Sequence, residues 1–161
     1  MKPVVAVLMG SDSDAGYLKP CGNVLRELGI PFEARVLSAH RTPDETVDFV
    51  KSAKKKGFKV IIAAAGGSAH LAGVAAANTS LPVIGIPVET PSLKGLDSLL
   101  STAQMPAGTP VATVAVGSAG VKNAAFLAAR ILALSDKKLE KALELYKEEN
   151  KKKILGKKVE L

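Results

Sequence analysis

The sequence holds only two histidines, His40 and His70, and each stands in a short segment of small and polar residues. Imidazole takes up and releases protons near neutral pH, so it suits a reaction that needs one group as both acid and base. His40 is followed by Arg41, whose planar guanidinium can form paired hydrogen bonds to a phosphate. From the residues alone, His40 is either a proton carrier or an exposed loop histidine. His70 is either a ligand contact or a partly buried polar residue.

A second polar segment follows Gly10, where Ser11, Asp12, Ser13 and Asp14 stand in a row. Hydroxyls and the free N–H groups at the start of a helix are typical ligands of phosphate. The carboxylate of Asp14 can accept hydrogen bonds from a ribose diol. The same residues also fit a capping box with no ligand role. The segment therefore predicts either a nucleotide site or a plain helix start.

A third segment, from Ala65 to His70, contains the pair Gly66 and Gly67 followed by Ser68. Paired glycines before a helix let the backbone approach a ligand closely. The spacing differs from the G-x-G-x-x-G fingerprint of dinucleotide sites, and the sequence has no P-loop, H-E-x-x-H or G-x-S-x-G motif. These absences favour chemistry carried by the histidine loops themselves.

Each polar segment follows a short apolar run with the character of a buried strand. Such runs, and the helical stretches between them, predict strands over 4–9, 32–37, 59–64, 82–86 and 111–116, and helices over 15–28, 42–56, 69–78, 93–104 and 119–134, with a last helix from about 135. Thr42, Pro43 and Glu45 predict a capping box at the start of the second helix, and Gly57 predicts its end. The Asp97–Gln104 portion lies inside the fourth helix.

Strands that alternate with helices indicate a parallel sheet covered on both faces. We expect an α/β fold, a three-layer flavodoxin-like doubly wound sheet with five parallel strands in the order 2-1-3-4-5 and an extra C-terminal helix. We expect one domain over 1–161, with a helical tail from about 135. Ligands of such sheets bind beyond the carboxyl ends of the strands, and the three polar segments would converge there because each follows one of the first three strands.

Composition narrows the classes of function. The 161 residues include one cysteine, Cys21, so no internal disulfide and no cysteine-based metal cluster can form. Neither a signal peptide nor a membrane span is visible, and the protein is expected in the cytoplasm. The net charge is +7, but nine of the 22 Lys and Arg follow Ser135 among glutamates, a pattern typical of a solvated helix. We therefore expect no nucleic-acid partner, no membrane, no metal and no cofactor.

The order and spacing of the motifs resemble one enzyme family over most of the chain, from Val4 to about Leu134. The motifs are Gly10-Ser11-Asp12-Ser13-Asp14, Ser38-Ala39-His40-Arg41-Thr42-Pro43, Gly66-Gly67-Ser68-Ala69-His70-Leu71, Asp97-Ser98-Leu99 and Gln104-Met105-Pro106. They are similar to those of the N5-carboxyaminoimidazole ribonucleotide mutase family, the class I form of the phosphoribosylaminoimidazole carboxylases.

The resemblance implies an isomerase of purine biosynthesis. Its substrate is a phosphoribosyl aminoimidazole with a carboxylate on the exocyclic nitrogen, which the enzyme moves to ring carbon C4. The resemblance assigns the phosphate to Ser11 and Arg41, the ribose to Asp14, the carboxylate to His70 and proton transfer to His40. It implies that the substrate pocket is completed by Asp12, Ser13, Ser38, Ala65, Gly66, Gly67, Ser68 and Leu71.

Two positions depart from the family pattern: Ala64 stands where the family usually has Gly, and Ser68 where it usually has Ala. Class II relatives, which use free CO2, typically carry Lys after the loop histidine, so Arg41 favours class I. A class II carboxylase is nevertheless the closest alternative. A flavodoxin-like electron carrier, a receiver-type signalling domain and a nucleic-acid module are more distant ones.

The family also implies a homo-octamer with sites between subunits. The Pro87–Pro110 stretch contains loops that can reach a neighbour. Two other features fit close contacts between subunits or packing inside one chain: a face of small residues at Ala69, Gly73 and Ala77, and an apolar stripe on the tail helix at Leu139, Ala142, Leu143 and Tyr146.

Overall fold

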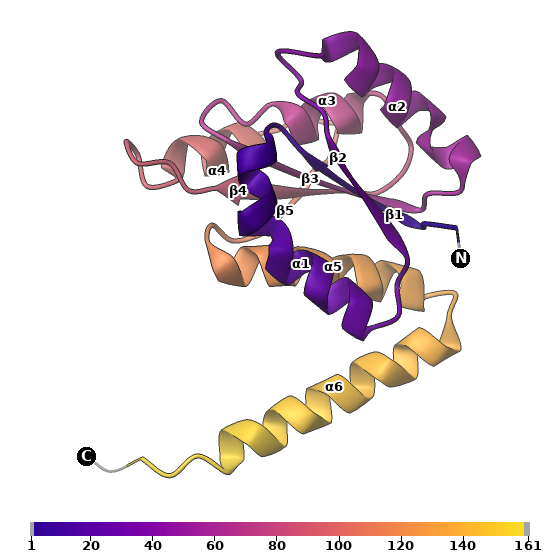
Figure 1. Ribbon diagram of the computed structural model, residues 1–161, viewed down its shortest axis with the longest axis vertical. Helices are drawn as coiled ribbons and strands as arrows, with labels where there is room; N and C mark the ends of the chain where they lie inside the picture. Colours follow the sequence, from indigo (N-terminus) through magenta and orange to yellow (C-terminus); the bar gives the residue numbers. More distant parts are fainter. Residues whose placement is uncertain (1, 160–161) are drawn as a thin grey trace.

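A parallel five-stranded sheet forms the centre of the molecule (Figure 1). The structure is a computed structural model, and it describes residues 2–159. The strands are β1 (Val5–Met9), β2 (Phe32–Val36), β3 (Val60–Gly66), β4 (Val83–Val88) and β5 (Ala112–Thr113). They lie in the order β2-β1-β3-β4-β5, and every neighbouring pair is parallel. The predicted doubly wound sheet and its strand order are confirmed.

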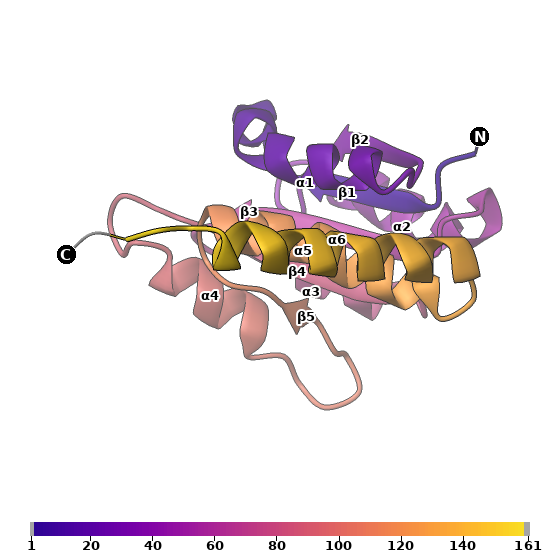
Figure 2. The same ribbon diagram turned by 90° about the horizontal axis from the view of Figure 1, so that it is seen from below.

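Helices cover both faces of this sheet (Figure 2). They are α1 (Ala15–Glu27), α2 (Pro43–Lys56), α3 (Leu71–Ala77), α4 (Leu96–Ala103), α5 (Ser118–Ala133) and α6 (Lys137–Leu155), with a short 3-10 helix, η1, at Asp12–Asp14. α1 and α5 lie side by side on one face, and α2, α3 and α4 cover the other (Figure 1). Among the described residues, none of these helices has the length and apolar character needed to cross a membrane.

Alternate residues of the central strands supply the two halves of the core. Val5 and Val7 of β1 pack under α1 and α5, whereas Ala6 and Leu8 pack under α2 and α3. All residues of β1 are buried, so both faces of the strand are covered. This burial on both faces explains why the sequence of a central strand is a continuous apolar run.

The ends of α2 show one prediction that is right and one that is wrong. The helix begins at Pro43 and ends at Gly57, whose φ of 104° is a left-handed conformation that suits glycine. Thr42 is the N-cap residue, but its side chain does not cap the helix. Its hydroxyl instead accepts a hydrogen bond from the N–H of Ser38 at 2.9 Å and donates to the Ser38 carbonyl at 3.1 Å. The predicted capping box is therefore absent.

Several elements are shorter than predicted. β5 has two residues because it is an edge strand that pairs only with Ile84 and Gly85 of β4. α3 begins at Leu71, so His70 is its N-cap residue and Ala69 lies in the preceding loop. α4 begins three residues later than expected, after Gly95 in a left-handed conformation with φ of 85°.

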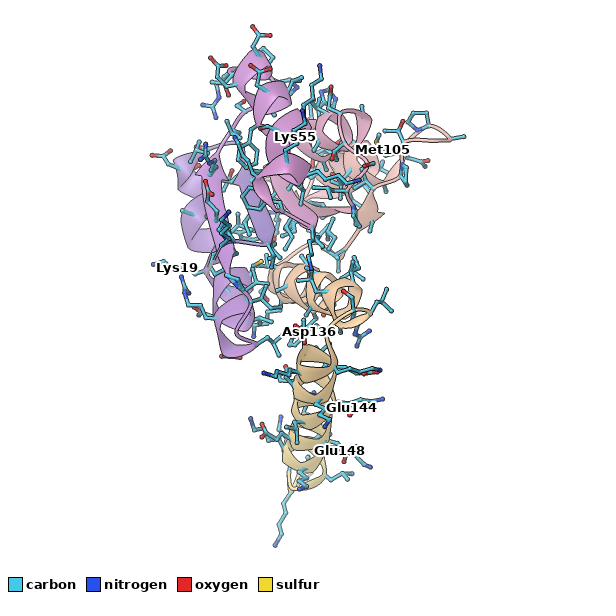
Figure 3. The ribbon with its side chains drawn as sticks, turned by 90° about the vertical axis from the view of Figure 1, so that its right-hand side faces the viewer. Lys19, Lys55, Met105, Asp136, Glu144 and Glu148 are labelled. Carbon is cyan, nitrogen blue, oxygen red and sulfur yellow. The ribbon has the colours of Figure 1, made fainter. Side chains whose placement is uncertain are left out.

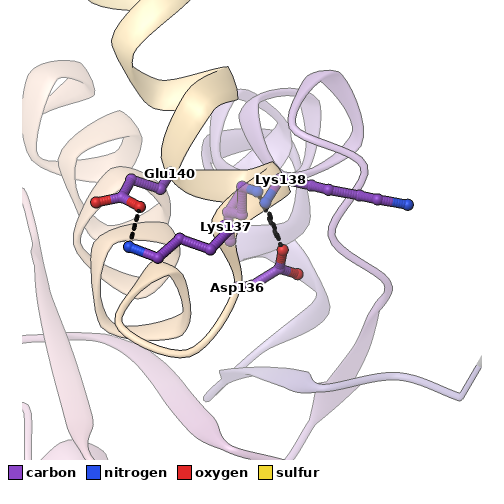
Figure 4. A network of polar contacts seen from close by, with 5 residues as sticks. Asp136, Lys137, Lys138 and Glu140 are labelled. Carbon is purple, nitrogen blue, oxygen red and sulfur yellow. Dashed lines mark hydrogen bonds and ion pairs between the residues drawn. The ribbon is translucent and has the colours of Figure 1, made fainter.

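The last helix, α6, extends past the body of the molecule (Figure 1). Asp136 caps it by accepting hydrogen bonds from the N–H groups of Lys138 and Leu139, and Lys137 pairs with Glu140 at 2.8 Å (Figure 4). These contacts stabilise the first turn of the helix.

The apolar stripe of α6 packs within its own chain. Leu139 is buried against the α1–α5 half of the core, Leu143 is half-buried there, and the ring of Tyr146 lies 4.6 Å from that of Phe126. The side chains of 147–155 are exposed, and this end of the helix projects from the body (Figure 3). The stripe therefore has an intramolecular partner and does not by itself indicate a second subunit.

Candidate functional site

The three polar loops that follow β1, β2 and β3 meet at the carboxyl edge of the sheet. Arg41 of the second loop donates a hydrogen bond from Nη2 to the carbonyl of Gly10 in the first loop. His40 of the second loop contacts His70 of the third loop. The topological switch of the sheet lies beside β1, so this is the edge at which doubly wound folds bind ligands.

The first loop is held together by its own side chains. The Ser11 hydroxyl accepts from the N–H of Ser13 at 3.3 Å, and the Asp14 carboxylate accepts from the N–H of Ser11 at 3.2 Å, which completes a capping box. The Ser13 hydroxyl donates to that of Ser11 at 2.8 Å, and Asp12 also accepts from the N–H of Ser13. The side chains remain at the surface, where hydroxyls and N–H groups can turn to an anion.

Ser38 organises the second loop around Arg41. Its hydroxyl accepts hydrogen bonds from the backbone N–H of Arg41 at 3.2 Å and from Nε at 3.4 Å. Its carbonyl accepts from the hydroxyl of the buried Thr46 at 3.2 Å, so the loop is fastened to α2. The guanidinium of Arg41 is thus directed toward the first loop, where it brings a positive charge beside Ser11.

The two imidazoles form a direct pair. Nε2 of His40 lies 2.8 Å from Nδ1 of His70, and the rings meet edge to face with their centroids 4.9 Å apart. One nitrogen must donate and the other accept, so the neutral pair shares one hydrogen at this contact. Both side chains are exposed. The pair places two proton-transfer groups together although they are 30 positions apart in the sequence.

The third loop turns sharply after β3. Gly66 is the last residue of the strand, and Gly67 has a φ of 66°, a left-handed conformation that favours glycine. Ala65 is half-buried, and Ser68 is exposed. Leu71 is only 2% exposed and packs in the core beneath α2. Of the predicted pocket residues, it is the one whose side chain does not reach the surface at the carboxyl edge of the sheet.

Two serines of α4 also contact this site, and they were not among the predicted site residues. The Ser98 hydroxyl accepts a hydrogen bond from the N–H of Gly67 at 2.9 Å, and the Ser101 hydroxyl accepts from that of Ala69 at 3.0 Å. Ser98 is fully buried, so its hydroxyl ties the half-buried Gly67 to the interior of the protein. The available sequence signal was that two of the three hydroxyl residues of α4, Ser98 and Ser101, stand at i and i+3.

Other ionisable groups are poor candidates for chemistry. Burial raises the pKa of the Cys21 thiol to about 12, so it is not a nucleophile near neutral pH. Burial and the nearby Glu89 raise the pKa of Tyr17, whose hydroxyl accepts a hydrogen bond from the N–H of Gly117 at 3.0 Å. Within residues 2–159, no three His, Cys, Asp or Glu side chains are grouped to hold a metal ion.

A separate hollow lies away from the three loops. It has a volume of about 1070 Å³ and lies between α5 and α6, lined among others by Phe126, Arg130 and Glu144. None of its lining residues belongs to the three loops. This groove between two helices lacks convergent groups that could transfer a proton, so the edge with the two histidines is the stronger candidate site.

Comparisons with known proteins point to one family. A family model described as AIR carboxylase matches residues 4–153. The N5-carboxyaminoimidazole ribonucleotide mutase of Brucella melitensis is 58% identical over 140 residues, which are 87% of this chain and 86% of that protein. The bifunctional purine synthesis protein purC/E of Dictyostelium discoideum is 53% identical over 91% of this chain, which spans only 15% of that protein. The crystal structure of Treponema denticola PurE matches with a TM-score of 0.86 at 34% identity, over 95% of this chain and 94% of that chain.

Proposed function

This chain belongs to the AIR carboxylase family, and on that premise we propose that it catalyses the N5-carboxyaminoimidazole ribonucleotide mutase reaction of purine biosynthesis. The reaction is an isomerisation that moves a carboxylate from the exocyclic nitrogen of an aminoimidazole ribonucleotide to ring carbon C4. The observation that carries the proposal is the pair of imidazoles 2.8 Å apart at the edge where the three loops meet. The reaction needs one group that serves as both acid and base, and imidazole meets that need.

The phosphate and ribose belong, in this proposal, to the first two loops. Ser11 and Ser13 offer hydroxyls, and Arg41 offers a guanidinium that already reaches the carbonyl of Gly10. Asp14 accepts the ribose hydroxyls, and Asp12 lines the same loop. The contacts within the loop explain how it is ordered before substrate arrives, because its polar groups satisfy one another until a phosphate replaces some of those bonds.

The aminoimidazole would then lie between the second and third loops. Ser38, Ala65, Gly66, Gly67 and Ser68 line this region, and His70 faces the carboxylate. Leu71 contributes through its backbone and its packing, since its side chain lies in the core. The left-handed turn at the half-buried Gly67 lets the backbone approach the ring closely.

His40 carries the proton in both halves of the reaction. The bond between the exocyclic nitrogen and the carboxyl carbon breaks, CO2 is released, and protonated His40 gives its proton to the departing nitrogen. The electron pair at C4 then attacks CO2 and forms the new carbon–carbon bond. Neutral His40 removes the proton from C4, which restores the aromatic ring and the starting charge of the enzyme. Protons and electrons balance without a cofactor or metal.

We propose that the sites are completed by further copies of this chain in a homo-octamer. His40 and His70 are exposed in the single chain, whereas released CO2 must be retained. Leu93, Leu96 and Leu100 are 56%, 54% and 49% exposed, and they lie in the Pro87–Pro110 region next to the third loop. Such a cluster of leucines is typical of a protein interface.

Most residues of the other two features proposed for assembly pack within the same chain, whereas Ala77 is exposed. A Cβ at Gly73 would lie 3.1 Å from the sulfur of Met105, and Ala69 is buried. Gly73→Leu would therefore disturb the packing of α3 against the segment that follows α4, whatever the number of subunits. Leu139, Leu143 and Tyr146 pack on the body of the protein.

Light scattering tests the assembly. Leu96→Glu with Leu100→Glu should reduce the mass of the particle, because two buried charges would oppose the contact. Leu145→Glu on α6, where Leu145 is 65% exposed, is the matched control. An active monomeric wild type would contradict the shared site.

A mutase assay with the N-carboxylated ribonucleotide tests the activity. We expect conversion without added bicarbonate, ATP or metal. Conversion only of the uncarboxylated ribonucleotide, with dependence on dissolved CO2, would instead assign the chain to the class II carboxylases. We propose that the reaction takes place in the cytoplasm, where the lone thiol of Cys21 stays reduced.

A further inference from the structure

The third loop is held in its conformation by α4, a helix about 30 positions further along the chain. Ser98 bridges two segments through one hydroxyl, which accepts from the N–H of Gly67 at 2.9 Å and donates to the carbonyl of Val88 at 2.6 Å. Its donor and one acceptor site are thus used, and the side chain is completely buried. The hydroxyl connects the third loop to the end of β4.

Ser101 makes a second connection one helical turn later. Its hydroxyl accepts from the N–H of Ala69 at 3.0 Å and lies 3.1 Å from the carbonyl of Gly67 and 2.7 Å from that of Asp97. Residues at i and i+3 share a helix face, so both serines face the same loop. The two serines together contact both ends of the turn from Gly67 to Ala69.

The start of α4 is itself fixed. The Thr90 hydroxyl donates to the carboxylate of Asp97, at 2.9 Å from Oδ1 and 3.0 Å from Oδ2. This bond connects the residues after β4 to the first turn of α4. The helix therefore presents Ser98 and Ser101 from a supported position.

We propose that Ser98 and Ser101 are positioning residues, which hold the backbone of the third loop and thereby set His70 against His40. His70 directly follows the turn, and its ring is 2.8 Å from that of His40. Gly66 and Gly67 stand at the start of the turn, and Gly67 is left-handed, so the conformational preferences of these residues hold the backbone weakly. Loss of the serine contacts would let Gly67–Ala69 move and would separate the imidazoles.

This inference rests on the proposed mutase function for its kinetic consequence, but its structural consequence is independent of that function. The chain has only two histidines, so imidazole NMR signals report on His40 and His70 alone. A changed contact between the rings changes the tautomers and the chemical shifts of both signals. The NMR measurement therefore needs no substrate.

Thr102 supplies a matched control. It is also a buried hydroxyl residue of α4, but its hydroxyl donates to the Ser98 carbonyl inside the helix at 2.7 Å and does not contact the loop. Thr102→Val keeps a β-branched side chain and removes one buried hydroxyl with its hydrogen bond. The variant should therefore lower the stability of α4 while the contacts between α4 and the third loop remain.

The experiment compares full-length wild type with Ser98→Ala, Ser101→Ala, the double variant, Ser101→Thr and Thr102→Val. We expect kcat of the double variant to fall about 10-fold or more while KM changes much less, because a small displacement of the reacting groups lowers turnover strongly. Both imidazole signals should shift in the alanine variants. Ser101→Thr retains the hydroxyl at this half-buried position, so its kcat and its imidazole signals should be closer to those of wild type than are those of Ser101→Ala.

The inference is overturned if the imidazole signals of the alanine variants coincide with those of wild type. It is also overturned if Thr102→Val produces the same shifts and the same loss of kcat. If the double variant does not fold, Ser101→Ala carries the test, because Ser101 is not fully buried. A wild type without mutase activity would refute the proposed function, and the NMR comparison would still decide whether the serines position the histidines.

Discussion

The first and third loops both present small polar residues at the same edge of the sheet, but they are ordered in different ways. Contacts in the first loop join residues one to three positions apart, from Ser11 to Asp14. The third loop has two local backbone hydrogen bonds, from the N–H of Ala69 to the carbonyl of Gly67 and from the N–H of His70 to the carbonyl of Ser68. Its side-chain partners, however, are distant: Gly67 and Ala69 bond to Ser98 and Ser101, which are 31 to 34 positions away. A loop of the first kind is a local structure, whereas the second depends on the position of another helix.

This difference suits different tasks. Phosphate binding tolerates small movements, because several hydroxyl and N–H donors can turn toward the same anion. Proton transfer requires a defined distance and angle between the reacting groups. The loop that carries His70 is the one held by tertiary contacts, and the loop assigned to the phosphate is the one that holds itself.

The largest expected effect is on kcat when His40 is replaced, and it should distinguish the role of the second loop in chemistry from the role of the first loop in binding. His40→Asn preserves much of the size of the side chain and removes its titrating ring, so kcat should fall about 100-fold or more. Ser11→Ala in the first loop should instead act mainly on KM. Steady-state kinetics of the two variants test the division, and near-normal turnover in His40→Asn would contradict it.

Removal of the guanidinium next to the first loop should have a smaller effect. Arg41→Ala removes a charge-assisted contact to the phosphate, which is worth about 1.5–3 kcal/mol, or about 10-fold to 100-fold in affinity. Its melting temperature should change little, since Arg41 is exposed. Calorimetric titration with the ribonucleotide measures the affinity. Arg26→Ala is the control, because Arg26 lies in the last turn of α1, whereas the first loop precedes the start of that helix. Equal affinities of the two variants would refute the phosphate role of Arg41.

The glycines of the two loops give a smaller, structural contrast. Gly67→Ala forces a Cβ into a left-handed conformation and should lower the free energy of unfolding by about 1 kcal/mol. Gly10 does not have positive φ, and a Cβ there has no heavy atom within 4 Å, so Gly10→Ala should be close to neutral. Denaturant unfolding compares them, and equal stabilities would show that the turn can relax.

The smallest expected effect is that of chelation. Exhaustive EDTA treatment should leave the mutase activity unchanged, because the proposed chemistry is performed by an imidazole and the loops offer no grouped metal ligands within the described residues. A loss of activity that a divalent ion restores would contradict the proposal that an imidazole performs the chemistry without a metal ion. Untreated enzyme in the same buffer is the control.

Sequence reasoning worked where one local signal dominated. Continuous apolar runs predicted the buried strands, the alternation of five strands with helices predicted their order, and Pro43 and Gly57 predicted the ends of α2. It was wrong where a side chain had two competing partners. The Thr42 hydroxyl was predicted to cap α2 but bonds to Ser38, because the backbone turn of the loop brings that residue closer.

The candidate site divides in the same manner. Residues 11–14 could be recognised from a short motif, because their contacts are local, and the structure contains the capping box that the motif also predicted. The 2.8 Å contact of His40 with His70 could be expected only in outline, from the convergence of strand ends. The role of Ser98 was hidden, because its spacing from Ser101 shows a shared helix face but does not indicate that its hydroxyl faces Gly67.

The sequence by itself determined the alternation of strands and helices, the parallel sheet and the presence of imidazole, guanidinium and hydroxyl groups at its carboxyl edge. These follow from hydrophobic period, turn residues and side-chain chemistry, all of which are local properties. Only the tertiary structure decided that the stripe of α6 packs on Phe126, that Leu71 faces the core and that α4 holds the third loop. Such contacts depend on where distant elements come to lie, and that position is a property of the whole packed core.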